Sequence, residues 1–378
     1  MNVVDFWTRQ SANGPRLFDH VAVIGGGAWG TALAIIAARA GRTVSLWCRR
    51  EQVADEINET RKNASFLGDT EIPSGVTATS VLADALRSAD ITLLVTPSGT
   101  LRDVSHQMAP HLCADAPVIL CAKGIEVGTG KLLTDVVAEE LPGHVIGVLS
   151  GPTFAQEAAK GFPTAVTVAS PILSADNVEN SVAARLAVSL GSEAFRPYVS
   201  DDVVGVEIGG AVKNVIAIAC GMMTGAGFAE NTRSALITRG LDEMKALADA
   251  LGGRRETVTG LSGVGDLTLT CSSMTSRNMS LGVQLGEGKA RSDCFDGRPV
   301  VVEGERNSIS VTDLARLKGI EMPIAEAVRS ILHDGAELGE TFARLWSRPL
   351  EAEPRALDVT LEHPADETAI QRLADTIS

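Results

Sequence analysis

The sequence has few basic residues for its length, and this shortage excludes whole classes of partner. Lysine and arginine together number 33 against 47 aspartate and glutamate residues, which gives a formal net charge of −14. Proteins that bind nucleic acid or an anionic membrane surface carry clustered positive charge. We therefore expect neither partner, and a phosphorylated small molecule only where basic groups gather locally.

Other signatures are also absent. The six cysteines form no C-x-x-C pair and no disulfide-like cluster, which favours a reducing compartment. The six histidines form no pair at metal-ligand spacing on one helix, so we predict no metal site. The N-terminus lacks the apolar segment of a signal peptide, and no apolar run reaches the length of a membrane span. A cytoplasmic protein is the expectation.

The clearest positive signal is a glycine-rich turn near the N-terminus. Residues 21–24 predict a short buried strand, residues 25–30 read Gly-Gly-Gly-Ala-Trp-Gly, and residues 31–40 predict a helix. A flexible turn alone would be a weak signal, but strand, G-x-G-x-x-G and helix together are the context of a dinucleotide-binding fingerprint.

Each residue of this turn has a predicted role. Gly25 permits the tight turn, Gly27 lets the backbone reach a pyrophosphate, and Gly30 lets the helix pack closely on the strand. The amides of Ala28 and Trp29 would point at the phosphates from the helix N-terminus, where the dipole favours anions.

The pattern of elements predicts two domains of different class in this 378-residue chain. Short apolar strands alternate with helices at first, as in an α/β Rossmann domain with a doubly wound, mostly parallel sheet. After about residue 204, long helical patterns replace the strands. We expect an N-terminal extension (1–19), the Rossmann domain (20–204), an all-α substrate and catalytic domain (205–347) and an acidic, loosely docked tail (348–378).

Lys213 lies in the middle of an apolar helical segment, residues 206–220. A helix that is hydrophobic all round is buried, and burial lowers the pKa of a lysine, which makes it a usable base near neutral pH. The alternative is that the lysine extends its charge to water along its aliphatic stem. Gly209 and Gly210, one turn earlier, favour the first interpretation, because they let another backbone or a ligand approach.

Further polar candidates follow predicted strands or begin helices. Lys123 and the turn Ser150–Thr153 come at the carboxyl ends of strands, where ligands of doubly wound sheets bind. In the helical half, Ser276, Arg277 and Asn278 begin a helix and could hold a phosphate. A solvated lysine, a capped turn and a capped helix with an exposed arginine are the alternatives.

Taken together, these segments resemble the bacterial-type NAD(P)-dependent glycerol-3-phosphate dehydrogenase family. The resemblance extends over roughly residues 20 to 346 and rests on eight motifs in order: 25–31, 122–124, 150–155, 209–214, 235–240, 263–266, 276–278 and 301–304. It implies an active site in the cleft between the two domains, and oxidation of sn-glycerol 3-phosphate at C2 to dihydroxyacetone phosphate. In cells the reaction would run mainly as reduction, for phospholipid synthesis. A homodimer is expected.

The resemblance also implies roles for individual residues. Lys213 matches the proton acceptor. From the residues themselves, we expect the like charge of Lys123 to help lower the pKa of Lys213, and Asp266 is a candidate to orient it. Substrate contacts are implied for Lys123, Gly151, Thr153, Lys213, Asp266, Ser276, Arg277 and Asn278. Cofactor contacts are implied for Gly25, Gly27, Ala28, Trp29, Gly30, Arg49, Arg50, Lys123, Ala155, Arg277, Val301 and Glu303.

Three other functions are compatible with parts of the pattern. A hydroxyacid dehydrogenase of the same fold group would need a carboxylate site in place of the phosphate site. A sugar-nucleotide dehydrogenase would need a catalytic cysteine, for which Cys271 is the only candidate near the site. A nicotinamide-sensing regulatory protein would have no use for a buried lysine.

The residues after the second predicted strand bear on the choice of cofactor. NAD-selective sites place an Asp or Glu there, roughly 20 residues beyond the glycines, to bind the ribose 2′-hydroxyl. This chain has Cys48 followed by Arg49 and Arg50, which suit a 2′-phosphate. We therefore predict a preference for NADP(H), with NAD(H) accepted more weakly; solvated arginines, one of them neutralised by Glu51, are the alternative.

Overall fold

The computed structural model describes residues 16–172, 175–352 and 359–377. The chain forms two compact units, one made of the residues up to Lys123 with 131–207, the other of 124–130 with 208–378. The chain thus crosses between the units three times. Residues 1–15 of the predicted N-terminal extension lie outside the described residues.

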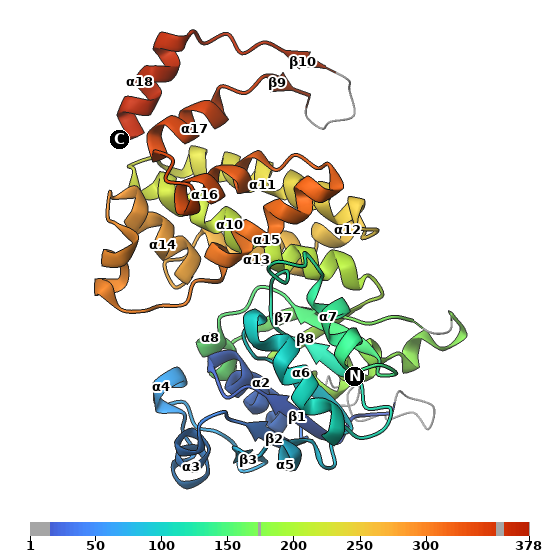
Figure 1. The fold of residues 1–378 in the computed structure, drawn as a ribbon. Coiled ribbons are helices and arrows are strands. Elements are labelled where there is room, and N and C mark those ends of the chain that lie inside the picture. The colour runs from blue at the N-terminus through green and yellow to red at the C-terminus, as the bar shows by residue number, and fades with distance from the viewer. Residues whose placement is uncertain (1–15, 173–174, 353–358, 378) are drawn as a thin grey trace, which may run out of the picture. The chain divides into compact units, whose positions relative to one another are not determined.

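The first unit is built on an eight-stranded sheet of order β3-β2-β1-β4-β5-β6-β7-β8 (Figure 1). All neighbouring strands run parallel except β6 and β7, so the predicted mostly parallel, doubly wound sheet is confirmed. The strand β3 was not predicted, because its four residues carry too short a pattern. The strands are His20–Ile24 (β1), Thr43–Trp47 (β2), Val76–Thr79 (β3), Ile91–Leu94 (β4), Val118–Leu120 (β5), Ile146–Ser150 (β6), Thr164–Ala169 (β7) and Phe195–Ser200 (β8).

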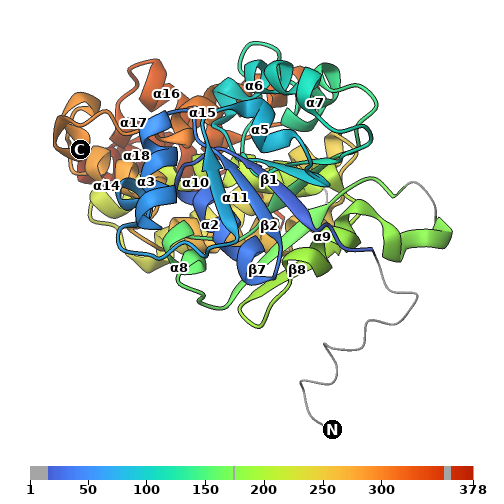
Figure 2. The ribbon, with the colours of Figure 1, turned by 90° about the horizontal axis from the view of Figure 1, so that it is seen from below.

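Helices cover both faces of this sheet (Figure 2). One face packs against α2 (Ala28–Arg39), α8 (Ala155–Ala159) and α9 (Val182–Leu190), the other against α5 (Leu82–Leu86), α6 (Leu101–Met108) and α7 (Leu133–Glu140). Two more helices, α3 (Glu51–Thr60) and α4 (Ala64–Leu67), follow β2.

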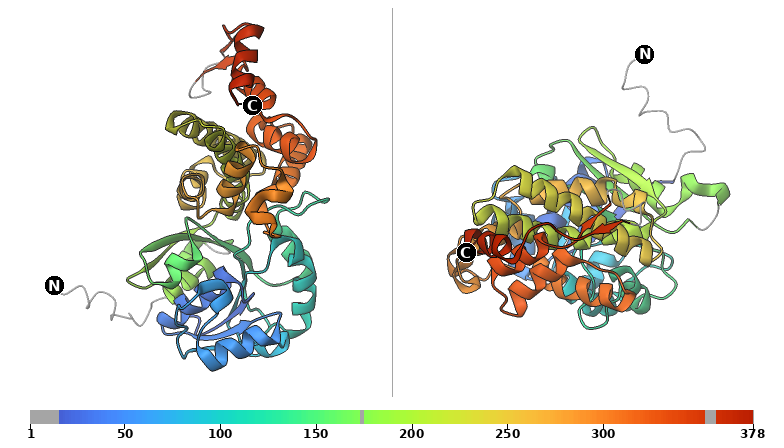
Figure 3. Two further views of the ribbon diagram at one scale, coloured as in Figure 1. Left: turned by 90° about the vertical axis from the view of Figure 1, so that its left-hand side faces the viewer. Right: turned by 90° about the horizontal axis from the view of Figure 1, so that it is seen from above.

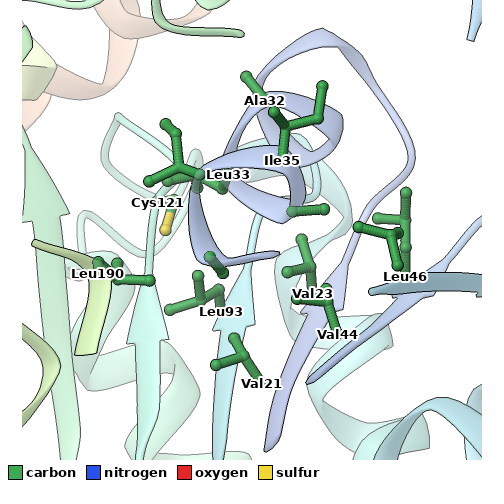
Figure 4. Packing of buried hydrophobic residues seen from close by; sticks show 14 of the residues in the cluster. Val21, Val23, Ala32, Leu33, Ile35, Val44, Leu46, Leu93, Cys121 and Leu190 are labelled. Atoms are coloured by element: carbon green, nitrogen blue, oxygen red, sulfur yellow. The ribbon is translucent and has the colours of Figure 1, made fainter. Parts of the chain in front are cut away.

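Alternate residues of β1 enter the two cores, as a strand buried on both faces requires. Val21 and Val23 pack with Leu33 of α2 on one side (Figure 4), and Ala22 and Ile24 join the other core.

The second unit is helical, as predicted (Figure 1). The helix α15 begins at Glu303, because acidic residues suit a helix N-terminus and Gly304 packs closely on the backbone of Asn214. The helices are α10 (Val203–Gly225), α11 (Glu230–Ala250), α12 (Arg255–Val258), a π-helical turn (Leu261–Gly265), α13 (Asp266–Cys271), α14 (Arg277–Gly286), α15 (Glu303–Lys318), α16 (Pro323–His333) and α17 (Leu338–Trp346).

The helix α10 is the core element of the second unit. It is long and apolar enough to cross a membrane, but 89% of its most apolar window is buried inside the protein, as in the central helix of a globular domain. Its first turn belongs to the first unit, where Val206 packs against Val148 and Ala169. One unbroken helix therefore carries the chain from one unit into the next.

The helices α10 and α14 touch through their backbones. A Cβ atom on Gly221 would lie 2.3 Å from the Met279 carbonyl oxygen, and one on Gly282 would lie 2.2 Å from the Ile218 carbonyl oxygen. Gly225 and Gly286 repeat this close approach one turn further on. Only glycine fits at these four positions without moving the two helices apart.

The C-terminal segment differs from the loosely docked tail that we expected. After the short pair β9 (Leu350–Glu351) and β10 (Thr360–Leu361), the helix α18 (Glu367–Ile377) returns to lie beside α17 (Figures 1 and 3). Leu373 and Ile377 line an apolar cavity together with Phe342 and Trp346. The apolar residues of α18 recur at helical spacing, but we did not predict this helix because the segment is acidic overall. Residues 353–358 and 378 lie outside the described residues.

Candidate active site

The glycine-rich turn lies between β1 and α2, where the sequence predicts it. Gly25 has a φ of +131°, and a Cβ there would lie 2.9 Å from the carbonyl oxygen of Val95. A Cβ on Gly30 would lie 1.8 Å from the Gly25 carbonyl oxygen, so glycine is required for the helix to approach the strand. Both contacts agree with the predicted roles of these two glycines.

Gly27 differs from its neighbours, because a Cβ there would meet no atom within 4 Å. Gly27 is the N-cap of α2, and Ala28 and Trp29 are its first residues and half-buried. Helix N-termini carry unsatisfied N–H groups and attract anions. This N-terminus therefore has open space beside amides that would attract an anion.

Asn63, which we did not single out in the sequence, holds this turn in place. Its Nδ2 donates to the Gly26 carbonyl oxygen at 3.1 Å and to the Thr31 hydroxyl at 2.8 Å, and the residue is fully buried. Asn63 lies 32 residues beyond Thr31, in a segment with no periodic pattern, so only the folded structure shows the contact.

Arg49 and Arg50 follow β2 and are exposed. Neither guanidinium forms an ion pair within the described parts of the chain. The preceding residue, Cys48, is buried, and burial raises the pKa of its thiol to about 11. A Cβ on Gly26 would lie 2.3 Å from the Cys48 sulfur, so the cysteine packs against the glycine-rich turn and is chemically inert there.

The ends of β5 and β6 bring a second set of predicted residues together. The Lys123 Nζ donates to the Gly151 carbonyl oxygen at 3.4 Å, and the Thr153 hydroxyl donates to the same oxygen at 3.3 Å. A Cβ on Gly151 would lie 2.9 Å from the Val166 Cα, which requires glycine. Ala155 begins α8 just beyond.

Two buried hydroxyls at the same edge of the sheet lack partners. Thr96 follows β4 and Ser150 ends β6, and neither side-chain oxygen has a hydrogen-bond partner among the described residues. Buried polar groups normally find a partner. Orphaned hydroxyls beside Lys123 and Gly151 are therefore consistent with a ligand site at the carboxyl ends of these strands.

In the second unit, Lys213 is buried and does not extend to water; 7% of the residue is exposed. Its Nζ donates to the Asp266 Oδ1 at 2.5 Å and to the Thr270 Oγ1 at 2.8 Å. The side chain of Asp266 is 1% exposed. The structure thus joins the two predicted residues Lys213 and Asp266, and it adds Thr270, which the sequence analysis did not name.

Local packing explains how α13 comes to face α10. A Cβ on Gly209 would lie 2.7 Å from the Ser262 carbonyl oxygen, so the backbone of the π-helical turn lies directly on α10. A Cβ on Gly263 would lie 1.8 Å from the Val258 carbonyl oxygen. These two glycines bring the start of α13, with Asp266, next to the lysine. The predicted close approach at the Gly209 position is the approach of another backbone.

A second buried network surrounds the residue after the lysine. The Asn278 Nδ2 donates to the Asn214 Oδ1, and the Gly304 amide donates to the Asn278 Oδ1, both at 2.9 Å. The Asn214 Nδ2 donates to the Glu303 Oε2 at 3.3 Å. Asn278 and Glu303 thus hold α10, α14 and α15 together, whatever they contact in a bound substrate or cofactor. Asn214 was part of a quoted motif but had no predicted role.

The remaining predicted residues lie at element ends. The Ser276 hydroxyl caps α14 by accepting from the Met279 amide at 3.3 Å, and Arg277 is exposed in the first turn. Val301 is 62% exposed, just before α15. An exposed guanidinium at a helix N-terminus suits a phosphate. Among the described residues, no three His, Cys, Asp or Glu side chains are arranged to hold a metal ion.

Comparison with known proteins agrees with this geometry. Two family models match, the N-terminal and C-terminal parts of NAD-dependent glycerol-3-phosphate dehydrogenase, over residues 20–176 and 202–343. A glycerol-3-phosphate dehydrogenase [NAD(P)+] of Rhodospirillum rubrum is 48% identical over 338 residues, which are 89% of this chain and 95% of that protein.

Two further similarities cover the same span. The protein of that name from Parvibaculum lavamentivorans is 48% identical, over 89% of this chain and 98% of its own. A crystal structure of glycerol-3-phosphate dehydrogenase from Coxiella burnetii matches with a TM-score of 0.81 at 37% identity, covering 88% of this chain and 99% of its own. Since the family models and these relatives cover both units in order, the chain belongs to the NAD-dependent glycerol-3-phosphate dehydrogenase family.

Proposed function

We propose that this protein is an NAD(P)-dependent sn-glycerol-3-phosphate dehydrogenase that interconverts dihydroxyacetone phosphate and sn-glycerol 3-phosphate. The observation that carries the proposal is the buried Lys213, held by Asp266 and Thr270, in a chain of this family. The relatives' names supply the reaction. The cofactor phosphates would bind at the N-terminus of α2, and the open space at Gly27 supports this.

The step that the protein's own side chains must carry out is a proton transfer at the C2 oxygen of the substrate. The dinucleotide supplies the hydride in the reductive direction. Lys213 gives its proton to the oxygen of C2, and in the oxidative direction it takes the hydroxyl proton. Hydrogen bonds to Asp266 at 2.5 Å and Thr270 at 2.8 Å fix the Nζ in one orientation, so little reorganisation is needed during the reaction.

The other predicted residues would bind the substrate and the cofactor. Arg277 and the first amides of α14 would hold the substrate phosphate, with Asn278 behind them. Lys123, Gly151 and Thr153 would contact the substrate from the sheet, and Lys123 and Ala155 the cofactor. Binding energy from the phosphate, which does not react, would position C2 for the reaction.

Cys271 does not support a sugar-nucleotide dehydrogenase. It is fully buried, and burial raises the pKa of its thiol well above the usual range. A catalytic cysteine needs a thiolate, which burial opposes.

The finer parts of the proposal are the choice of cofactor, the pathway and the setting. We infer a preference for NADP(H) over NAD(H) from the exposed Arg49 and Arg50. A supply of glycerol phosphate for phospholipid synthesis, a cytoplasmic location and a homodimer follow from the family resemblance. Sedimentation of the purified protein would test the dimer.

The direct test is an assay of reduced nicotinamide consumption on adding dihydroxyacetone phosphate, with a matched pair of arginine variants. Arg277→Ala should raise the KM for dihydroxyacetone phosphate about 10- to 100-fold, since a charge-assisted hydrogen bond contributes about 1.5–3 kcal/mol. The turnover of non-phosphorylated dihydroxyacetone should change little. Arg306→Ala, an exposed arginine of α15, is the control.

No turnover of dihydroxyacetone phosphate by the wild type with either cofactor would end the proposal. An equal loss on both substrates in Arg277→Ala would remove the phosphate role from that residue and leave the reaction standing.

A further inference from the structure

Glu207 is a buried acid that the proposed reaction does not use. It lies in the second turn of α10, is 3% exposed and precedes Lys213 by six residues. Its carboxylate accepts from the Thr134 amide at 3.1 Å and from the Thr134 hydroxyl at 2.6 Å. No ion pair to Glu207 is present in the described parts of the chain, so these hydrogen bonds carry the interaction.

Thr134 lies at a particular place in the fold. It is the second residue of α7, whose N-cap position, Leu132, has no side chain that can cap the helix. The Glu207 carboxylate does this from another element, and the Leu133 amide also contributes. A carboxylate at a helix N-terminus satisfies orphan amides and complements the dipole. Glu207 is thus the cap of α7, supplied across 73 residues of chain.

The contact links two of the three places where the chain passes between the units. Glu207 is the last residue of the first unit before the chain continues into the second as α10. Thr134 follows the return crossing, three residues after Lys131, and the segment 124–130 that precedes it begins next to Lys123. One carboxylate therefore fastens the segment that leads to Lys213 to the segment that follows Lys123.

Stability alone gives little reason for a charged group here. Taking a carboxylate out of water is costly unless its hydrogen bonds are complete, and no cation of the described residues pairs with Glu207. Two hydrogen bonds to one threonine, however, fix both the position and the rotation of the α10 turn that bears Glu207. A helix is stiff, and six residues of it extend only roughly 9 Å.

We propose that Glu207 is a positioning residue for the dehydrogenase reaction: by anchoring α10 to the N-terminus of α7 through Thr134, it sets where Lys213 stands relative to the substrate. It acts through Lys213 and does not touch the reacting atoms. The inference rests on the role proposed above for Lys213. A misplacement of about 1 Å can cost about 100-fold in rate, so a modest movement of α10 has a large effect.

Four variants test the anchor. Glu207→Ala removes both hydrogen bonds and should lower kcat about 10- to 100-fold. Glu207→Gln keeps the shape and one acceptor, and should recover most of the rate. Thr134→Val keeps the amide but loses the hydroxyl donor, and should lower kcat less than Glu207→Ala. Thr134→Ser retains the hydroxyl and should behave as the wild type.

Two measurements separate positioning from a purely structural role. The affinity for NADPH, followed by its fluorescence, should stay within about twofold of the wild type, because the fall is expected in kcat. Substituting NADPH deuterated at the transferred position should slow Glu207→Ala more than the wild type, because the hydride step becomes rate-limiting when the lysine is misplaced. Loss of folded protein alone would scale the rate without changing the isotope effect.

A double variant tests whether Glu207 acts through Lys213. In a Lys213→Ala background, Glu207→Ala should have no further effect on the residual rate if it acts through the lysine. An independent loss in that background, or wild-type kcat in both Glu207→Ala and Thr134→Val, would overturn the proposal. If Glu207→Ala does not fold, Glu207→Gln and Thr134→Val decide by the same readouts. A fully active Lys213→Ala would instead remove the lysine from the mechanism, while absence of turnover in the wild type would overturn the proposed function.

Discussion

The candidate sites of the two units are built from different parts of the chain: backbone groups in the first unit and buried side chains in the second. In the first, the candidate cofactor site consists of backbone: glycines, helix amides and strand ends, with open space at Gly27 and exposed arginines at its edge. In the second, the buried side chains form hydrogen bonds in pairs: Lys213 donates to Asp266, and Asn278 donates to Asn214. Backbone sites fail when a side chain is added, whereas buried polar networks fail when one is removed.

The largest effect should come from removing the buried cation. Lys213→Ala should fold, bind cofactor and lose about 100- to 10,000-fold in kcat, the usual contribution of a general acid–base group. Lys318→Ala, an exposed lysine of α15, is the matched control and should keep full activity. Turnover close to the wild type in Lys213→Ala, measured with dihydroxyacetone phosphate and NADPH, would exclude the lysine as the proton donor.

The backbone site can be broken by adding a single methyl group at Gly30. Because a Cβ there would lie 1.8 Å from the Gly25 carbonyl oxygen, Gly30→Ala must displace backbone and should lower the free energy of unfolding by about 3 kcal/mol. Gly27→Ala places its methyl in open space, so the fold should keep its stability while cofactor affinity falls. Denaturant titration with and without NADPH measures both effects.

Equal destabilisation by Gly27→Ala and Gly30→Ala would show that the space at Gly27 is not kept for a ligand. Unchanged cofactor affinity in Gly27→Ala would likewise show that the cofactor does not occupy the space at Gly27.

Glu207 makes the stability of the first unit depend on pH. Burial raises the pKa of its carboxyl from 4.5 to about 7, although the Thr134 and Leu133 hydrogen bonds lower it; nearby Asp135 raises it further. The native carboxyl therefore holds its proton in the window from about pH 4.5 to 7, where the unfolded one has lost it. Its contribution to stability is full below that window and disappears as the pH rises through 7, by roughly 3 kcal/mol.

Glu207→Gln removes this titration. Unfolding midpoints of the wild type and the variant, measured between pH 5 and 8, should therefore diverge as the pH rises, with the variant relatively more stable at the alkaline end. Parallel pH profiles would contradict a titrating Glu207.

The smallest effect concerns the exposed edge of the backbone site. Arg49→Ala and Arg50→Ala should each reduce the ratio of kcat/KM for NADPH to that for NADH by about 10-fold, because a solvated guanidinium contributes about 1–2 kcal/mol to a 2′-phosphate. Arg306→Ala again serves as control. A wild type that prefers NADH, or variants with an unchanged ratio, would contradict the predicted cofactor preference.

The same contrast explains how much the sequence could predict. The turn at Gly25–Gly30 and the burial of Lys213 are local signals, written in neighbouring residues, and both agree with the structure. Thr270, Asn63 and the Glu207–Thr134 pair act through contacts between distant segments, and no periodicity marks them. The helix α18 was not predicted, because the acidic composition of the tail outweighed the apolar stripe of that helix.

The four glycines between α10 and α14 have a consequence for how this protein can vary. Gly221 and Gly225, like Gly282 and Gly286, have the small-xxx-small spacing that pairs helices inside lipid bilayers, where close backbones replace the hydrophobic effect as the source of attraction. Here the same spacing fixes the distance between the axes of α10 and α14, because no side chain lies between the two backbones. The proposed phosphate-binding residues, Ser276–Asn278, lie at the start of α14, and Lys213 lies on α10. A single methyl group added at one of the four glycines would therefore push the helices apart and move these residues away from the proton donor.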